Sequence, residues 1–328
     1  PFPGVDPSLI ARTWSESPDL EGELAEMRHL AARPAVHAEP SRRLHPQVAE
    51  RLAELGIERL YRHQARAIDS ILAGRHTVVV AGTAAGKTLC YQVPIMEAAL
   101  EDPRSTAFCI YPTKALSQDQ ARSFSVVAAD LVAAATYDGD TPTDQRSAIR
   151  RAANVILTNP DMLHVGILPH HGRWADFFHR LRYVVVDELH TLRGIFGTHV
   201  SMVLRRLRRL CHHYGSDPVF VFGSATIGNP GELASRLCGL DVAVVDEDDS
   251  PRGEQWVVLW NPEMEDPEEG RRRSALAEAT DLFVDLVRRD VSTIVFARSR
   301  KSTELIYRWA TERLDAPRRN RIASYRRG

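Results

Sequence analysis

The chain has 328 residues, of which 44% are hydrophobic and 26% are charged. This composition excludes a disordered or fibrous protein, and the length suffices for two domains of ordinary size. Its 42 basic residues balance 43 acidic ones, for a formal net charge of -1. The chain as a whole therefore carries no basic signature of a nucleic-acid or membrane partner, and any binding of a polyanion must be local.

Cysteine usage and the chain ends give three further expectations. The spacing of Cys90, Cys109, Cys211 and Cys238 matches neither a zinc site nor a disulfide framework, so we expect reduced thiols in a cytoplasmic protein. No apolar run approaches the roughly 18 to 20 residues that cross a bilayer, and we expect no membrane partner. The chain lacks an initiator Met and ends in mid-pattern, which suggests a piece of a longer protein.

In chain order, a polar segment with several prolines comes first. Residues 1–43 predict a helical extension, with an amphipathic stretch over residues 20–30, and residues 45–55 predict a further helix. Short β-branched runs then alternate with helices, which is typical of a parallel sheet buried on both faces and thus of the α/β doubly wound class. The predicted strands are 77–80, 106–111, 132–136, 155–158, 183–186, 219–222 and 242–245, and the helices between them include 87–100, 117–130 and 198–214.

A shift in charge marks a second domain. Ten acidic residues and one basic residue lie between positions 246 and 269, so we expect residues 246–254 to form an acidic linker. A second α/β unit then begins, and we expect the chain to stop within it. Its predicted strand, helix, strand and helix cover residues 255–260, 274–289, 293–296 and 301–314.

The most specific motif is a turn of small residues between the predicted strand 77–80 and the next helix. In such a turn backbone N–H groups surround phosphate oxygens, the helix N-terminus adds partial positive charge, a lysine reaches the terminal phosphates and a hydroxyl binds Mg²⁺. Ala81 stands where the usual loop has its first glycine, and it keeps the turn compact. The residues predicted to hold a nucleoside triphosphate here are Gly82, Thr83, Ala84, Ala85, Gly86, Lys87 and Thr88.

Two adjacent acids follow the predicted strand 183–186. Side chains alternate along an extended strand, so Asp187 can face a Mg²⁺ ion while Glu188 faces the attacking water. An acidic pair by itself is usually a solvated loop. The four strand-forming residues before this pair, together with Lys87, favour a catalytic role, with Thr88 and Asp187 as the Mg²⁺ ligands.

With these two motifs the chain resembles the superfamily 2 helicases, in which Asp187-Glu188-Leu189-His190 is a DExH box. Shorter motifs follow in family order, and the nucleic-acid-binding ones lie just past predicted strands, where an open α/β sheet binds its ligands. Each is weak alone, but the series is specific. Residues 60–64 resemble an adenine-reading motif with Tyr61 and Gln64, and residues 224–226 resemble a coupling motif with Ser224 and Thr226. The motifs similar to nucleic-acid grips contain Pro112, Thr113, Lys114, Gly139, Thr158 and Asn159, and a second-domain motif contains Arg298 and Ser299.

The resemblance implies a RecA-like P-loop domain over residues 44–245 and the start of a second one over residues 255–328. It implies ATP and Mg²⁺ as cofactors, with Gln64 reading adenine, Glu188 acting as base toward water and His190 helping to couple ATP to strand movement. Residues 60–64, 81–91, 137–142 and 223–230 most resemble the Hrq and YprA-like DNA-repair helicases, which are 3′ to 5′ translocases on single-stranded DNA with a C-terminal metal-binding domain. That domain would lie beyond residue 328 or be absent.

Alternatives to a DNA helicase stay open at this point. One is an ATP-gated clamp that binds nucleic acid without processive unwinding, another is a P-loop ATPase unrelated to nucleic acid, and a third is an RNA helicase, since backbone contacts distinguish RNA from DNA poorly. The second domain of superfamily 2 motors supplies arginines to the γ-phosphate from a motif not found here. We therefore expect residues 1–328 alone to bind nucleotide but to hydrolyse it poorly.

Overall fold

The structure is a computed structural model that describes residues 7–16, 23–266 and 268–325. Leu20, at the start of the predicted amphipathic stretch, and the outermost residues at both chain ends lie outside this part. The chain forms two compact units, one of residues 34–251 and one of residues 1–33 with 252–328. No helix in the described part of the chain is both long and apolar enough to cross a membrane. All four cysteines are buried free thiols.

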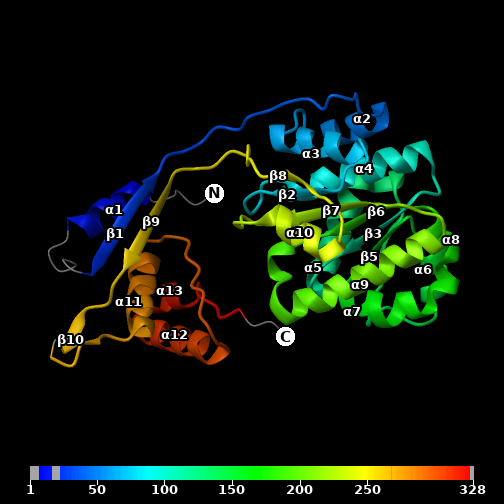
Figure 1. Ribbon diagram of the computed structural model, residues 1–328. Helices are drawn as coiled ribbons and strands as arrows, with labels where there is room; N and C mark the ends of the chain where they lie inside the picture. The colour runs from blue at the N-terminus through cyan, green and yellow to red at the C-terminus, as the bar shows by residue number, and fades with distance from the viewer. Residues whose placement is uncertain (1–6, 17–22, 267, 326–328) are drawn as a thin grey trace. The chain divides into compact units, whose positions relative to one another are not determined.

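The unit of residues 34–251 is built on a seven-stranded sheet with the order β4-β5-β3-β6-β7-β2-β8 (Figure 1). All neighbouring strands in it are parallel. Each strand lies within or beside its predicted range, so the predicted α/β class is confirmed. The strands are β2 (Thr77–Val80), β3 (Thr106–Ile110), β4 (Ala134–Thr136), β5 (Val155–Thr158), β6 (Leu181–Val186), β7 (Val219–Ser224) and β8 (Ala243–Val245).

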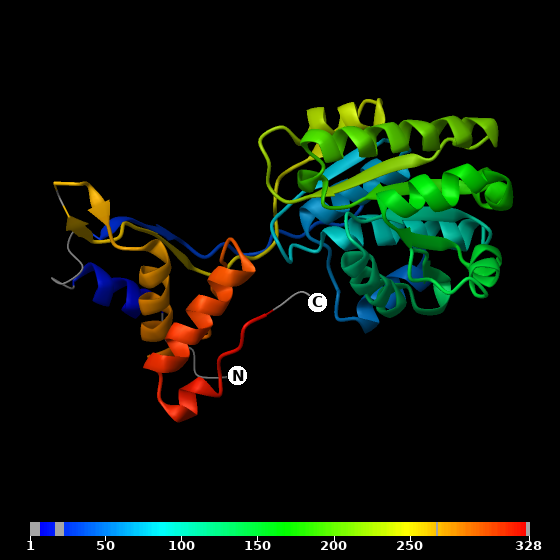
Figure 2. The same ribbon diagram turned by 90° about the horizontal axis from the view of Figure 1, so that it is seen from below.

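Helices cover both faces of this sheet (Figure 2). On β3, Phe108 and Ile110 pack in one apolar cluster with α9 and α10, whereas Ala107 and Cys109 pack in the other with α4 and α5. Both faces are thus buried, which explains the continuous apolar runs in the sequence. The helices are α2 (Pro46–Glu54), α3 (Arg62–Leu72), α4 (Lys87–Glu101), α5 (Lys114–Ala128), α6 (Arg146–Ala152), α7 (Pro160–Met162), α8 (Ala175–His179), α9 (Gly194–His213) and α10 (Pro230–Cys238).

In the second unit, the predicted helical stretch over residues 20–30 is wrong from residue 24 onward. Residues Leu24–Leu30 form a strand, β1, which pairs antiparallel with β9 (Gln255–Trp260). A bulge between Leu24 and Glu26 shifts the alternation of side chains there, so a spacing of three between Leu24 and Met27 imitates a helical period. Pairing with a strand more than 200 residues away therefore overrides the local pattern.

The remainder of this unit is mainly helical. Its other elements are α1 (Pro7–Ser15), β10 (Met264–Asp266), β11 (Arg271–Arg272), α11 (Ala275–Arg288), α12 (Arg300–Arg313) and α13 (Ala316–Arg319). The predicted strand 293–296 is wrong in this structure: the segment is irregular, with Ile294 and Phe296 exposed by 73% and 87%. A strand needs a hydrogen-bonding neighbour, and no segment in the described part of the chain pairs with this one.

We predict that Phe108→Ala destabilises the unit of residues 34–251 by about 3–5 kcal/mol, because it leaves a cavity in a filled core. Phe108 is fully buried, and its ring centroid lies 4.6 Å from that of Phe177 and 6.1 Å from that of Trp174. Urea unfolding measures the change. The control is Phe296→Ala at an exposed position, which should change the free energy of unfolding by less than about 0.5 kcal/mol. Equal effects of the two substitutions would contradict this packing.

Candidate nucleotide and nucleic-acid site

The loop between β2 and α4 has the backbone of a phosphate-binding turn. Gly86 adopts a left-handed conformation with φ of 72°, and Ala84 does so with φ of 61°. A Cβ on Gly86 would lie 2.4 Å from Nε2 of Gln64, so any other residue would displace the Gln64 amide and strain the left-handed backbone. The ammonium of Lys87, the first residue of α4, donates to the carbonyls of Ala81 and Gly82 at 2.9 and 2.7 Å. The predicted phosphate residues thus form one compact turn.

The start of α3 holds the second half of this loop. Nε2 of His63 lies 3.0 Å from the carbonyl oxygen of Ala85, and Nε2 of Gln64 donates to that of Gly86 at 3.1 Å. Oε1 of Gln64 accepts from the backbone N–H of Tyr61 at 2.8 Å. Gln64, predicted to read adenine, is 4% exposed and already binds protein at both ends of its amide. One amide hydrogen and one lone pair remain for a base.

An acidic side chain holds the first half of the loop. Oδ2 of Asp248 accepts from the backbone N–H of Gly82 at 3.0 Å, and Oδ1 accepts from the N–H and the hydroxyl of Ser250. Burial opposes ionisation of Asp248, but these hydrogen bonds outweigh it and lower the pKa. The predicted linker 246–254 is therefore corrected: its first part belongs to the compact unit 34–251 and packs on the phosphate loop.

The next residue, Asp249, ties the same segment to α3. Its backbone N–H donates to Nδ1 of His63 at 3.2 Å, and its carboxylate, 5% exposed, pairs with Arg62 at 2.7 Å. Since Nδ1 of His63 accepts here, Nε2 must carry the proton and donate to Ala85. Burial lowers the pKa of His63, which favours this neutral form.

Asp187 follows β6 and lies in a buried polar cluster. Its Oδ2 accepts from the hydroxyl of Tyr91 at 3.1 Å, and that hydroxyl also lies 3.3 Å from the hydroxyl of Tyr111 and interacts with the side chain of Thr88. Burial, reinforced by the negative charge of Asp187, raises the pKa of Tyr91 well above its ordinary value, so the phenol stays protonated and can donate. A Cβ on Gly223 of β7 would lie 2.2 Å from Oδ1 of Asp187, so glycine there makes room for the carboxylate. The structure thus links the two predicted Mg²⁺ ligands, Thr88 and Asp187, through Tyr91.

Glu188 adopts a strained backbone conformation that lies beside the coupling motif. Its φ of 56° and ψ of 42° are left-handed values, which cost a non-glycine residue about 1–3 kcal/mol and concentrate at functional sites. Its carboxylate lies 3.3 Å from Nδ1 of His190, and the same nitrogen lies 3.4 Å from the backbone N of Ala225. Ser224 is fully buried and donates to the carbonyl of Ala225, whereas Thr226 is exposed. His190 therefore contacts both Glu188 of the acidic pair and Ala225, the middle residue of the Ser224-Thr226 motif.

Two predicted nucleic-acid motifs meet at the ends of β3 and β4. Nζ of Lys114 donates to Asp140 at 2.8 Å, and this hydrogen bond raises the pKa of Lys114. A Cβ on Gly139 would lie 3.1 Å from the same Nζ. Thr113, next to half-buried Pro112, caps α5 by accepting from Leu116 N–H. The two motifs are thus adjacent, and in this structure Lys114 forms a solvent-exposed ion pair with Asp140.

Two residues of the predicted grip are buried, which corrects their assignment as direct phosphate contacts. Thr158 is fully buried and its hydroxyl donates to the carbonyl of Tyr137 at 2.7 Å. Asn159 is 6% exposed and caps the start of α7, where its Oδ1 accepts from the N–H of Met162. Both side chains instead fix the chain where β5 ends. Arg298 and Ser299 are exposed in the other unit, where Ser299 caps α12.

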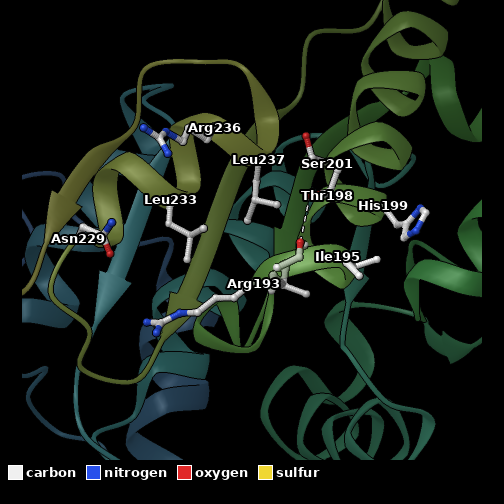
Figure 3. A pocket seen from close by; sticks show the side chains of 12 residues that line it. Arg193, Ile195, Thr198, His199, Ser201, Asn229, Leu233, Arg236 and Leu237 are labelled. Atoms are coloured by element: carbon white, nitrogen blue, oxygen red, sulfur yellow. Dashed lines mark hydrogen bonds between the residues drawn. The ribbon is translucent and has the colours of Figure 1, made fainter.

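Two pockets border these groups. One of about 570 Å³ is lined by Tyr61, Gln64, Gly86, Thr88 and Gln92, among others. Oε1 of Gln92 is a buried acceptor with no hydrogen-bond partner in the described part of the chain. The second pocket, of about 800 Å³, lies between the start of α9 and α10 (Figure 3). Its lining includes Arg193, which follows the acidic pair, and Asn229, which follows the Ser224-Thr226 motif.

Sequence reasoning missed several residues that shape the site. Tyr91 stands four positions after Lys87, on the same face of α4, and that helical spacing was the available signal. His63 lies between two predicted residues of the adenine motif. Asp248 gave no local signal, because its partner Gly82 is 166 positions away.

We predict that Gly86→Ala weakens nucleotide binding by about tenfold or more, because the new methyl group would strain a left-handed residue and displace Gln64. Fluorescence titration with a labelled ATP analogue measures the affinity. The matched control is Gly172→Ala, where φ is not left-handed and the added Cβ has no neighbour within 4 Å. Binding by Gly86→Ala at the affinity of the control variant would disprove this loop geometry.

A second prediction concerns pH. The pKa of His63 is lower in the folded chain than its free value of about 6.5, so its contribution to stability is complete above about pH 6.5 and is lost as the pH falls through the lower, folded pKa. Protonation would place an N–H at Nδ1 against the N–H of Asp249. Between pH 7.5 and 5.5, we expect the urea unfolding midpoint of His63→Gln to fall by less than that of the unmodified chain. His170→Gln, at an exposed position, should keep the original pH profile.

Comparison with known proteins identifies the family of this chain. Residues 61–233 match the DEAD/DEAH box helicase family. The chain is 45% identical over 258 residues to the uncharacterized ATP-dependent helicase YprA of Bacillus subtilis, covering 78% of this chain and 34% of that protein. It is 39% identical over 337 residues to the ATP-dependent helicase hrq1 of Schizosaccharomyces pombe, covering 98% of this chain and 32% of that protein.

A solved structure extends the similarity to the fold. The DUF1998 helicase MrfA, crystallised with DNA and AMPPNP, matches with a TM-score of 0.87 and 38% identity over 97% of this chain and 44% of that one. The chain spans about a third of the length of the two curated relatives. The phosphate loop, the acidic pair and these similarities lead to one assignment. The chain belongs to the DEAD/DEAH box helicase family and to its Hrq1- and YprA-like branch.

Proposed function

We propose that this chain is the ATP-binding part of an ATP-dependent DNA helicase that translocates 3′ to 5′ on single-stranded DNA and acts in DNA repair. The observation that carries the ATPase assignment is the buried cluster in which Tyr91 links Thr88 of the phosphate loop to Asp187 of the acidic pair. Two chemical requirements of ATP hydrolysis, a phosphate cradle and a metal-binding carboxylate, would thereby be met at one edge of the sheet.

The residues present fit ATP and Mg²⁺. Gly86 allows the loop to approach Gln64 closely, and the orphaned Oε1 of Gln92 offers a buried acceptor to a donor in the pocket beside Tyr61. Thr88 and Asp187 would hold Mg²⁺ through oxygen atoms, the ligands that this ion prefers. Bound Mg²⁺ would neutralise charge that develops on the β- and γ-phosphates.

Each protein group then has one task. The ammonium of Lys87 holds terminal phosphate oxygens in place of the two loop carbonyls that it binds in this structure. Glu188 orients the attacking water and accepts its proton. His190, in contact with both Glu188 and Ala225, passes the state of the site to the Ser224-Thr226 motif.

DNA as the substrate is supported by the DNA-bound MrfA structure, which is 38% identical to this chain. The 3′ to 5′ direction and the repair role extend this proposal through the resemblance to the Hrq and YprA-like branch. Four buried free thiols support a cytoplasmic location, because thiols stay reduced there.

We predict that Glu188→Gln lowers DNA-stimulated ATP hydrolysis by about 10²-fold or more while ATP still binds, because only the general base is lost. Lys87→Ala should weaken ATP binding itself. Both are tested in the longer protein that contains this chain. The matched control Glu50→Gln alters an exposed carboxylate of α2 and should leave the rate unchanged. An unaltered rate in Glu188→Gln would remove Glu188 from the mechanism.

Strand displacement separates the helicase from the ATP-gated clamp. The helicase unwinds a duplex with a 3′ single-stranded tail and leaves a 5′-tailed duplex intact. A clamp would hydrolyse ATP on both substrates without separating strands, and preference for a 5′ tail or for RNA would overturn direction or substrate.

A further inference from the structure

The amino edge of the sheet, opposite the proposed ATP site, has a pocket rich in arginine. Pro103 and Arg104 precede β3, residues 151–154 precede β5, and Arg180 precedes β6, so these segments meet where the strands begin. They line a pocket of about 550 Å³ together with residues of α6 and α8. Its arginines are Arg104, Arg150, Arg151, Arg173 and Arg180, and its carboxylate is Asp176.

The arginines differ in how they are held. Arg150 is half-buried, lies over the ring of Trp174 with its guanidinium carbon 5.9 Å from the ring centroid, and donates to the hydroxyl of Tyr137. Arg180 is half-buried and reaches Asp176 at 3.8 Å. Arg151 and Arg173 are exposed and form no ion pair with any residue that the structure describes. Neighbouring side chains thus hold Arg150 and Arg180 in place. The other two arginines are exposed to solvent and have no ion-pair partner among the described residues.

Two adjoining pockets continue the basic surface. A pocket of about 680 Å³ shares Arg104 and Arg180 with the first and adds Arg182. A third, of about 950 Å³, shares Gly215 to Asp217 with the second and adds Arg205, Arg208 and Arg209. Nine arginines and three aspartates line the three pockets together. A chain with 42 basic and 43 acidic residues therefore concentrates positive charge on this edge.

We propose that this amino-edge surface binds the phosphate backbone of duplex DNA, at a site separate from the one that holds single-stranded DNA and ATP. Arginine forks match phosphate geometry and read no bases. Single-strand sites usually add exposed aromatic rings for base stacking, whereas Trp174 and Phe177 beneath this pocket are only 2% and 4% exposed. A duplex, whose bases are already stacked inside, suits a surface that offers charge without exposed rings.

The test compares binding of a fluorescent blunt duplex to the 328-residue chain and its variants while an unlabelled oligonucleotide saturates any single-strand site. Arg151→Glu with Arg173→Glu should weaken duplex binding by about tenfold or more and reduce the slope of log affinity against log salt by about two, since two phosphate contacts are lost. Affinity for single-stranded DNA should not change. Replacing both by lysine should retain most of the duplex affinity, because the charge remains.

The matched control, Arg28→Glu with Arg308→Glu, makes the same change in net charge at exposed positions of the other unit and should bind duplex like the unmodified chain. The proposal is overturned if the unmodified chain binds no blunt duplex or if the control loses as much affinity as the test variant. It also fails if polyglutamate binds more tightly than duplex, since that would indicate an acidic protein partner. If the charge reversal prevents folding, Arg151→Gln with Arg173→Gln is measured instead. If the unmodified chain binds blunt duplex but no single-stranded DNA, the proposed function fails while this site stands.

Discussion

Parallel pairing of β2 between β7 and β8 is the constraint on which the site depends. Parallel strands must be joined by crossovers over the faces of the sheet, so both faces become apolar and every strand ends at the same edge. With β6, β7, β2 and β8 side by side, the acidic pair, the Ser224-Thr226 motif, the phosphate loop and Asp248 emerge next to one another in that order. Residues separated by more than 160 positions then lie within hydrogen-bond distance.

The phosphate loop is held from both sides. His63 and Gln64 bind its second half, Asp248 binds its first half, and Asp249 connects these two supports through His63. A loop supported in this way needs little reorganisation to receive phosphate, and this is how a preorganised site lowers the barrier of a reaction. The same hydrogen bonds join residues 61–64, the proposed adenine motif, to the segment that follows β8. At the opposite edge of the sheet, arginines line the surface pockets instead. The two edges therefore differ in chemistry as well as in position.

Patterns that are complete within a few residues were predicted well. The β-branched run 77–80 followed by small residues and Lys87 predicted a strand, a turn and a helix start, because strand preference, close backbone approach and helix capping are local properties. The DExH pair at Asp187 was predicted for the same reason. Residues 24–30 and 293–296 were predicted wrongly, since a strand exists only when a neighbour pairs with it. Thr158 and Lys114 have the right chemistry for phosphate, but the fold directs one into the interior and pairs the other with Asp140.

The sequence alone determined the α/β class, the phosphate loop, the acidic pair and the family, because each is encoded in short runs whose physical meaning does not depend on distant residues. Tertiary structure decided that Asp248 supports the loop, that Tyr91 connects Thr88 to Asp187 and that arginines from four separate segments share one edge. The formal net charge of -1 for the whole chain gave no indication of this local basic surface. Hydrogen bonds and charge patches depend on distance in space, and only folding converts positions along the chain into such distances.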